Sequence, residues 1–194
     1  MFENDVIKAV HERRSTRSYL DKEISIEHIN TLLDAAIWAP SGGNNQSWLF
    51  TAIQNKEVLL HLNSLVRKGF TTYIPDDDYP GKHAVKIHAA RENFSFYFNA
   101  PAIIIASNAP NYENAMADCS LALENIFLVA TSLGLGSCYV NQLHWLRDDL
   151  NVREYLFELG IPKEHTICST AVIGYVDKPT LAPARKEGTT NIIT

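Results

Sequence analysis

The sequence predicts a mixed α+β fold in which helices cover a sheet of about four or five strands. Apolar residues recur at helical spacing in several segments, and short apolar runs bounded by turn residues indicate strands. With 194 residues, 46% of them hydrophobic and 20% charged, the chain can bury the core of a single domain spanning 1–194. Because helices separate the strands, some parallel pairing is expected, and the strand order stays open.

The N-terminal part of the chain predicts two amphipathic helices. The first covers about residues 3–13 and presents apolar side chains on one face. The second starts after Ser25, a residue type that caps helix N-termini, and ends before Pro40. After it come a turn-rich loop over 40–45, a strand over 48–54 and a helix over 57–67.

The middle of the chain contains the segment that we expect to be most mobile. Residues 69–82 hold two prolines, two glycines and the acidic run Asp76-Asp77-Asp78. A calcium loop is a weak alternative there, because the carboxylates are consecutive rather than alternating and no Glu follows at the required spacing. Residues 84–98 predict a helix that is aromatic on one side.

The C-terminal half predicts two strands, two helices and a tail. Strands are expected over 102–106 and 166–175, and an amphipathic helix over 147–159. The helix over 116–133 is almost apolar all round, which requires burial in a large core or across a subunit interface. In a chain this small, a dimer interface is part of our interpretation. The tail over 176–194 has little periodicity and is either disordered or laid across another surface.

Composition excludes several classes of function. The net charge of −5 argues against a general nucleic-acid surface, and no uncharged apolar stretch is long enough to predict a membrane span. No signal peptide is visible at the N-terminus. Three widely spaced cysteines, Cys119, Cys138 and Cys168, are expected to be reduced thiols. A cytoplasmic protein is therefore expected.

Arg13, Arg14, Ser15, Thr16 and Arg17 form the sharpest local signal. Guanidinium groups offer planar donor forks that match phosphate oxygens, so the cluster favours an anion such as a phosphate. The alternative is a helix C-terminus with cations that complement its dipole.

Two further motifs are weaker. Residues 39–48 read Ala-Pro-Ser-Gly-Gly-Asn-Asn-Gln-Ser-Trp, in which small residues allow a backbone to approach a flat ligand. Taken alone, they fit an ordinary helix-to-strand turn. Residues 134–140 carry two glycines, but they follow a helix rather than a strand and lack a third glycine. A dinucleotide-binding fingerprint is therefore rejected.

Taken together and in this order, the segments resemble the nitroreductase family of FMN-dependent enzymes. The matching motifs lie at 13–17, 39–48, 133–138, 159–162 and 172–175, and they span nearly the whole chain. The resemblance implies a central mixed, mainly antiparallel sheet covered by helices, in a homodimer whose subunits interlock around FMN. It further implies that the tail reaches across the partner, and that 69–98 is a variable lid that chooses the substrate.

The resemblance also implies roles for individual residues. Arg13 and Ser15 would bind the FMN phosphate with Arg14 nearby, and Arg17 would lie by the pyrimidine edge of the flavin, where it favours the reduced anion. The remaining expected contacts are Pro40, Ser41 and Asn44 from the partner subunit, Tyr139, Val140 and Asn141 against the ring, and Arg185 with Lys186 on the phosphate. Because FMN carries the hydride, no catalytic side chain and no metal are expected.

The expected reaction is ping-pong transfer of hydride from NAD(P)H through FMN to a nitroaromatic, quinone or similar electron-poor ring. Alternatives are a specialised family activity such as reductive dehalogenation or flavin breakdown, a flavin storage or sensing protein without turnover, and an anion-binding protein without flavin. One departure is that Asn141 and Gln142 stand where many members have Gly or Glu-Gly. Another is that an Asn and a Lys that hold the flavin in some members have no match in 68–78.

Overall fold

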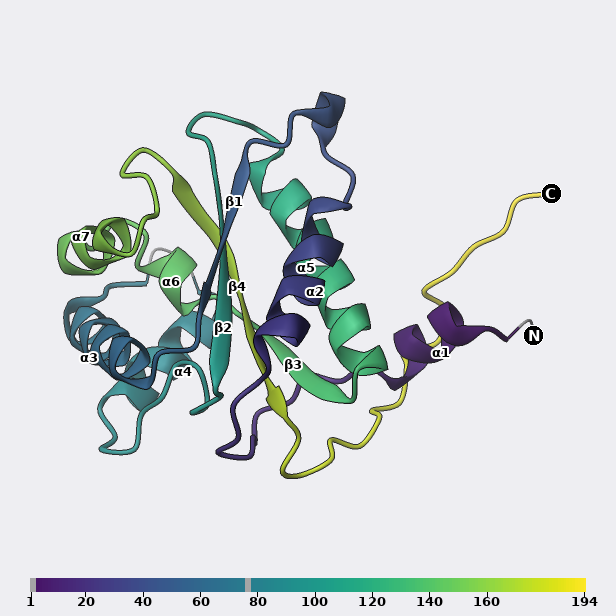
Figure 1. Ribbon diagram of the computed structural model, residues 1–194, viewed down its shortest axis with the longest axis horizontal. Helices are drawn as coiled ribbons and strands as arrows, with labels where there is room; N and C mark the ends of the chain where they lie inside the picture. The colour runs from purple at the N-terminus through teal and green to yellow at the C-terminus, as the bar shows by residue number, and fades with distance from the viewer. Residues whose placement is uncertain (1–2, 76–77) are drawn as a thin grey trace.

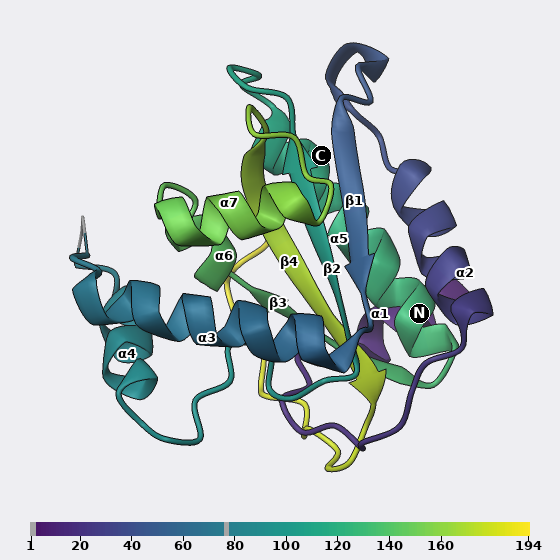
Figure 2. The ribbon, with the colours of Figure 1, turned by 60° about the vertical axis from the view of Figure 1, so that its left-hand side comes forward.

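The computed structural model describes residues 3–75 and 78–194, and the chain folds into three layers (Figures 1 and 2). A four-stranded sheet lies in the middle, with α2 and α5 on one face and α3, α4, α6 and α7 on the other. The helices are α1 Asp5–Glu12, α2 Ile26–Ile37, α3 Lys56–Thr72, α4 Pro80–Ala89, α5 Ala115–Ser132, α6 Gln142–Trp145 and α7 Leu150–Glu158, and a 3-10 turn, η1, covers Gly42–Asn44.

The sheet has the order β1-β2-β4-β3, and all three strand pairs are antiparallel. Its strands are β1 Trp48–Ile53, β2 Ala102–Asn108, β3 Leu135–Val140 and β4 Thr166–Tyr175. The expected antiparallel majority is confirmed. The parallel pairing expected from the helix-separated strands is reduced, among the described residues, to one isolated bridge between Ser15 and Ser137.

Two hydrophobic clusters fill the spaces above and below the sheet. The α2 and α5 face buries Leu32, Leu123 and Ile126 completely, together with alternate side chains of β2 and β4. On the other face, Leu62 and Phe70 of α3 pack with side chains of α7 and with the strand side chains that point to this face of the sheet. Because both faces are covered, β2 and the interior of β4 are buried throughout and carry almost continuous apolar sequence.

Several boundaries differ from those that the sequence predicts. The helix expected over 84–98 is α4, displaced to Pro80–Ala89, because Pro80 is suited to the first helical turn and the chain leaves the helix at Ala90. The helix expected over 147–159 begins only at Leu150, where the Asp149 side chain accepts the Val152 N–H and caps it. Strand β3 and helix α6 were missed.

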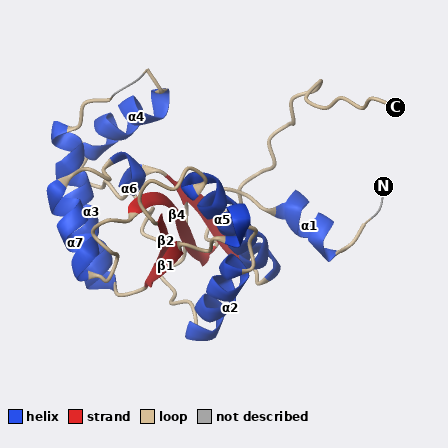
Figure 3. Cartoon of the chain, turned by 90° about the horizontal axis from the view of Figure 1, so that it is seen from above, coloured by secondary structure: helices blue, strands red, loops and turns tan. Residues whose placement is uncertain are grey.

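The two ends of the chain project from the body (Figure 3). Helix α1 packs against α5, and its apolar residues Val6 and Val10 are exposed. Residues 177–194 are exposed throughout and run as an extended tail. Asp76 and Asp77, part of the acidic run considered as a calcium loop and of the expected lid, lie outside the described residues.

Helix α5 is long and apolar enough to cross a membrane by length and composition alone, and it is the one such helix in the described part of the chain. Core helices pass the same test. Here α5 contacts α2 and all four strands, and its carboxylate Asp118 is buried and hydrogen-bonded. The structure therefore gives this helix a role in the core.

Candidate functional site

The main candidate site is a cavity of about 580 Å³ beside the edge strand β3. One wall is the end of β3 and the start of α6, a second is α4, and a third is the loop over 91–98. Its lining residues are Arg17, Gly81, Ala84, Val85, His88, Arg91, Asn93, Phe94, Ser95, Phe98, Cys138, Tyr139, Val140, Asn141, Gln142 and Trp145. Aromatic rings, amides and cations meet here, and each wall comes from a different part of the chain.

Buried aromatic residues and one asparagine hold the 91–98 wall in place. Phe96 and Tyr97 are buried, with ring centroids 5.3 Å apart. On α3, Asn63 donates from Nδ2 to the Phe94 carbonyl at 2.9 Å and accepts the Phe96 N–H on Oδ1 at 3.0 Å. With its backbone fixed on both sides, the loop leaves Phe94 and Phe98 at the cavity.

Arg17 brings the first motif into the cavity. Its guanidinium carbon lies 5.9 Å from the centroid of the Phe98 ring, a cation–π distance, and its Nη1 donates to the Ser15 carbonyl at 3.3 Å. The nearby Tyr19 hydroxyl donates to the Thr16 carbonyl at 2.7 Å, and burial raises the pKa of that phenol far above its usual range. The segment after α1 is thus pinned against the body.

Backbone pairing joins this segment to β3. Ser15 bridges Ser137, and the Thr16 N–H donates to the Ser137 carbonyl at 2.8 Å. Gly136 makes this contact possible, because a Cβ there would lie 2.6 Å from Oγ1 of Thr16. The pairing places the arginine segment along the outer edge of the strand that lines the cavity.

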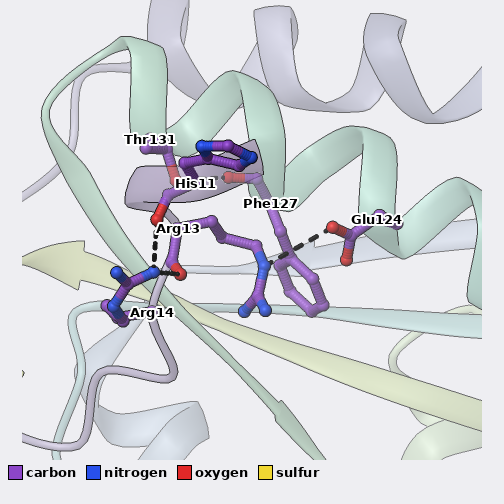
Figure 4. Close-up of polar contacts among 6 residues, drawn as sticks. All are labelled: His11, Arg13, Arg14, Glu124, Phe127 and Thr131. Atoms are coloured by element: carbon purple, nitrogen blue, oxygen red, sulfur yellow. Dashed lines mark hydrogen bonds and ion pairs between the residues drawn. The ribbon is translucent and has the colours of Figure 1, made fainter. Parts of the chain in front are cut away.

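Arg13 is the C-cap residue of α1 and reaches toward α5 (Figure 4). Its Nε lies 3.4 Å from Oε1 of Glu124, and its side chain is 27% exposed. Its terminal guanidinium nitrogens make no hydrogen bond to residues in 3–75 or 78–194, so that end of the fork is open to an anion.

Arg14 has a different environment from its neighbours. Its Nη1 donates to the carbonyls of His11 and Arg13, both at 2.6 Å, and so satisfies the last turn of α1 (Figure 4). The helix-capping alternative that the sequence left open thus describes Arg14. Arg14 also lines a smaller cavity of about 310 Å³.

The thiol of Cys138 lies near two of the arginines of the first motif, Arg13 and Arg17. Burial raises the pKa of the Cys138 thiol, whereas Arg17, Arg13 and Ser15 each favour the thiolate. Arg13, Ser15 and Arg17, which were expected to contact the phosphate and the ring edge of FMN, therefore all lie near the buried sulfur atom of Cys138. The adjacent Tyr139 lines the cavity as well, while its hydroxyl contacts Sδ of Met116 at 3.8 Å.

Pro40, Ser41 and Asn44 are not among the residues that line this cavity. Their loop lies over the N-terminal part of α5, where the Gly42 N–H donates to Asp118 and the Tyr112 hydroxyl donates to both Gly42 and Asp118. The side chains of Ser41 and Asn44 accept hydrogen bonds from Gln46. Both Asn44 and Gln46 have a positive backbone φ angle. This loop is ordered independently of the arginine segment.

Arg185 and Lys186 lie in the exposed tail and are not among the residues that line the cavity. Tyr73, Tyr79 and Lys82, which fall within the expected lid over 69–98, are not among the residues that line the cavity. The sequence did not indicate four residues that line the cavity, because no local motif distinguishes them: His88, Arg91, Asn93 and Trp145. The aromatic spacing around Phe94 and Phe98 was the only available signal.

The arrangement fits a flat aromatic ligand with an anionic tail. Aromatic walls and a strand end suit a ring, and Arg13, Ser15 and Arg17 supply donors at one edge. Among residues 3–75 and 78–194, no cluster of three or more His, Cys, Asp or Glu side chains could hold a metal ion.

A model of the Nitroreductase family matches residues 10–175. A crystal structure of a nitroreductase with bound FMN from Bacteroides fragilis is similar to this chain with a TM-score of 0.89 and 36% identity, covering 99% of this chain and 100% of that one. An Archaeoglobus fulgidus protein whose name pairs NADH dehydrogenase with NAD(P)H nitroreductase is 31% identical over 88% of this chain and 85% of its own length.

A second crystal structure, of a nitroreductase with bound FMN from Desulfitobacterium hafniense, has a TM-score of 0.84 over the full length of both chains. Its identity is 22%, so it supports the fold alone. The two matches cover 99% and 100% of this chain, so they include its tail as well as its sheet.

Proposed function

The chain belongs to the nitroreductase family, and from that premise we propose that it is an NAD(P)H-dependent flavin oxidoreductase with FMN beside β3. The supporting observation is the meeting of Arg13, Ser15 and Arg17 around Cys138, next to an aromatic-walled cavity of about 580 Å³. FMN supplies the hydride chemistry when bound, accepting hydride from NAD(P)H and passing it to an acceptor.

The donor set fits the cofactor from one end to the other. We assign the FMN phosphate to the open guanidinium end of Arg13 and the Ser15 hydroxyl, with Arg14 holding the end of α1. Arg17 would lie at the pyrimidine edge, where its charge stabilises negative charge on the ring. Tyr139, Val140 and Asn141 would face the ring from the strand end.

A homodimer is part of the proposal. The loop with Pro40, Ser41 and Asn44 lies on the α5 face and does not reach the cavity, so its contact with FMN requires a second chain. The tail with Arg185 and Lys186 extends away from its own body and could reach a partner in the same way.

An apolar groove supports the same assembly. Val6 of α1, Trp38 at the end of α2 and Val129 of α5 line a cavity of about 380 Å³. Trp38 is 79% exposed in the single chain, which is an unusual environment for an indole. We assign this surface to the subunit interface.

The turnover that we propose is ping-pong. NAD(P)H and the acceptor would use one slot in turn, stacked on the ring beneath the aromatic walls. A nitroaromatic acceptor takes up two electrons and two protons and leaves as the nitroso compound and water, while NAD(P)H becomes NAD(P)⁺. The chain holds both ligands in position and excludes water, and it needs no nucleophile of its own.

The segment 69–98 is proposed to be the substrate-selecting part of a single nitroreductase-like domain spanning 1–194. Its described residues from α4 to Phe98 supply two walls of the cavity. We also propose a cytoplasmic location, since the three cysteines are free and buried, as expected in a reducing compartment.

The test of the function is a visible spectrum followed by an anaerobic titration. The purified protein is expected to be yellow or to become so with FMN, and NADH or NADPH should bleach it. Addition of menadione or a nitroaromatic should restore the colour in a second half-reaction. Protein that binds FMN but is not bleached by either nucleotide would be a storage protein, and protein that binds no FMN would contradict the proposal.

The test of the dimer uses two matched substitutions. Trp38→Arg is expected to dissociate the subunits and weaken FMN binding together, measured by sedimentation equilibrium and flavin fluorescence. Leu150→Arg on α7, at a residue 81% exposed on the other side of the sheet, is the control and should leave both unchanged. A wild-type chain that is monomeric while saturated with FMN would refute the shared site.

A further inference from the structure

The charges that line the main cavity are all of one sign. Arg17 and Arg91 are its charged lining residues, His88 adds an imidazole, and no Asp or Glu of the described chain is among the lining residues. The chain as a whole carries a net charge of −5, so a cavity free of carboxylates does not reflect its general composition. Such a cavity attracts anions and disfavours cations.

Neither arginine of this cavity has an acidic partner among the described residues, but Arg17 is engaged by the Ser15 carbonyl and the Phe98 ring. The Arg91 guanidinium makes no ion pair or hydrogen bond with residues 3–75 or 78–194. Neighbouring cations are engaged: Arg67 donates to the Ala89 carbonyl at 3.0 Å, and Lys86 donates to the Tyr73 carbonyl at 2.7 Å. Arg91 therefore retains its full donor fork for a ligand.

The backbone around Arg91 is set by a tight turn after α4. The Arg91 N–H donates to the His88 carbonyl at 3.0 Å, and the Phe94 N–H donates to the Arg91 carbonyl at 3.3 Å. The turn continues into the loop that Asn63 holds. The side chain is exposed at the rim, but its base is attached to an ordered wall.

The rest of the cavity favours a planar ligand. Phe94 and Phe98 line the wall next to Arg91, and Trp145 of α6 lines the wall close to the start of α4. Tyr79 packs edge-on against Trp145 with centroids 6.2 Å apart, which fixes the indole. Aromatic faces beside a guanidinium suit a ring that carries an anionic substituent.

We propose that the acceptor selected by this cavity is an aromatic carboxylate, and that Arg91, with His88 beside it, binds the carboxylate while the reducible group lies over the flavin. The assignment rests on the proposed function. Arg17 is then left to the flavin edge, so the two arginines have separate ligands. Arg91 determines specificity and takes no part in the hydride transfer.

The experiment compares para-nitrobenzoate with its methyl ester, which has the same reducible group and no charge. Steady-state kcat/KM is measured for both with the FMN-loaded enzyme at saturating NADH. Arg91→Gln is expected to lower kcat/KM for the acid about tenfold, the scale of one charge-assisted hydrogen bond, and to change that for the ester by less than about twofold. Arg91→Lys should remain within about threefold of the wild type for the acid, because a charge is kept.

Control measurements distinguish a failure of this inference from a failure of the proposed oxidoreductase function. Lys68→Gln removes an exposed cation of α3 that does not line the cavity, and it should leave the acid-to-ester ratio unchanged. FMN content should be normal in Arg91→Gln, and menadione reduction should be normal in Lys68→Gln. Equal losses for acid and ester, or a loss confined to the KM of NADPH, would overturn the inference while leaving the oxidoreductase intact. Absence of menadione reduction in the wild type would instead refute the proposed function.

Discussion

Replacing Arg13 by Ala tests the proposed phosphate site most directly. The nitrogens of this guanidinium have different environments: Nε lies 3.4 Å from Oε1 of Glu124, and the two terminal nitrogens have no hydrogen-bond partner among the described residues. The open end matches the oxygens of a phosphate, with which it would form a charge-assisted pair. The substitution removes that pair and leaves the backbone cap of α1 in place.

The expected magnitude follows from the environment of Arg13. A hydrogen bond to a charged group contributes about 1.5–3 kcal/mol. The side chain is 27% exposed and already shares its charge with Glu124, so we expect a value near the middle, about 2 kcal/mol. That corresponds to about a thirtyfold rise in the Kd of FMN. Glu124→Gln should act oppositely and tighten binding by up to about fivefold, because a half-exposed carboxylate repels the phosphate by no more than about 1 kcal/mol.

The assay is fluorescence titration of flavin-free protein with FMN, repeated with riboflavin, which lacks the phosphate. Arg13→Ala should weaken FMN binding and leave riboflavin binding nearly unchanged. Arg14→Ala is the matched control, because its guanidinium is engaged by the carbonyls of His11 and Arg13. An unchanged FMN affinity in Arg13→Ala, or a larger effect from Arg14→Ala, would remove Arg13 from the phosphate site.

Two further predictions concern stability. Asp118→Ala removes the buried acceptor of the Gly42 N–H and the Tyr112 hydroxyl, and urea denaturation should show a loss of about 3 kcal/mol. Because burial raises the pKa of the Cys138 thiol, the unfolded chain releases this proton first, at about pH 8.5. The free energy of unfolding should therefore be insensitive to this thiol below that pH and fall above it, and Cys138→Ala should make the fall shallower. A slope that is identical in both proteins would contradict the assignment.

Most of the fold could be predicted because its signals are local. Strand β4 was expected over the same residues that it occupies, since a long apolar run between turn residues has few other readings. Ser25 was expected as an N-cap, and its side chain accepts the His28 N–H. Strand β3 was missed because Gly134 and Gly136 made its start resemble a loop, and only its pairing with β4 identifies it.

The site was predictable in part for a similar reason. Arg13, Ser15 and Arg17 form a compact motif, and the structure gathers them about Cys138. Arg91 and Asn63 could not be predicted from the sequence. Asn63 of α3 holds the loop that follows Arg91 through hydrogen bonds to Phe94 and Phe96, some thirty positions further along the chain. No spacing rule in the sequence encodes such a contact.

The bridge from Ser15 to Ser137 has a consequence for biosynthesis. The arginine segment is made first, but its place beside β3 is defined only after β3 has paired with β4, whose last residue is Tyr175. A nascent chain therefore cannot form the complete pocket before Tyr175 has left the ribosome, so flavin loading follows the synthesis of all four strands.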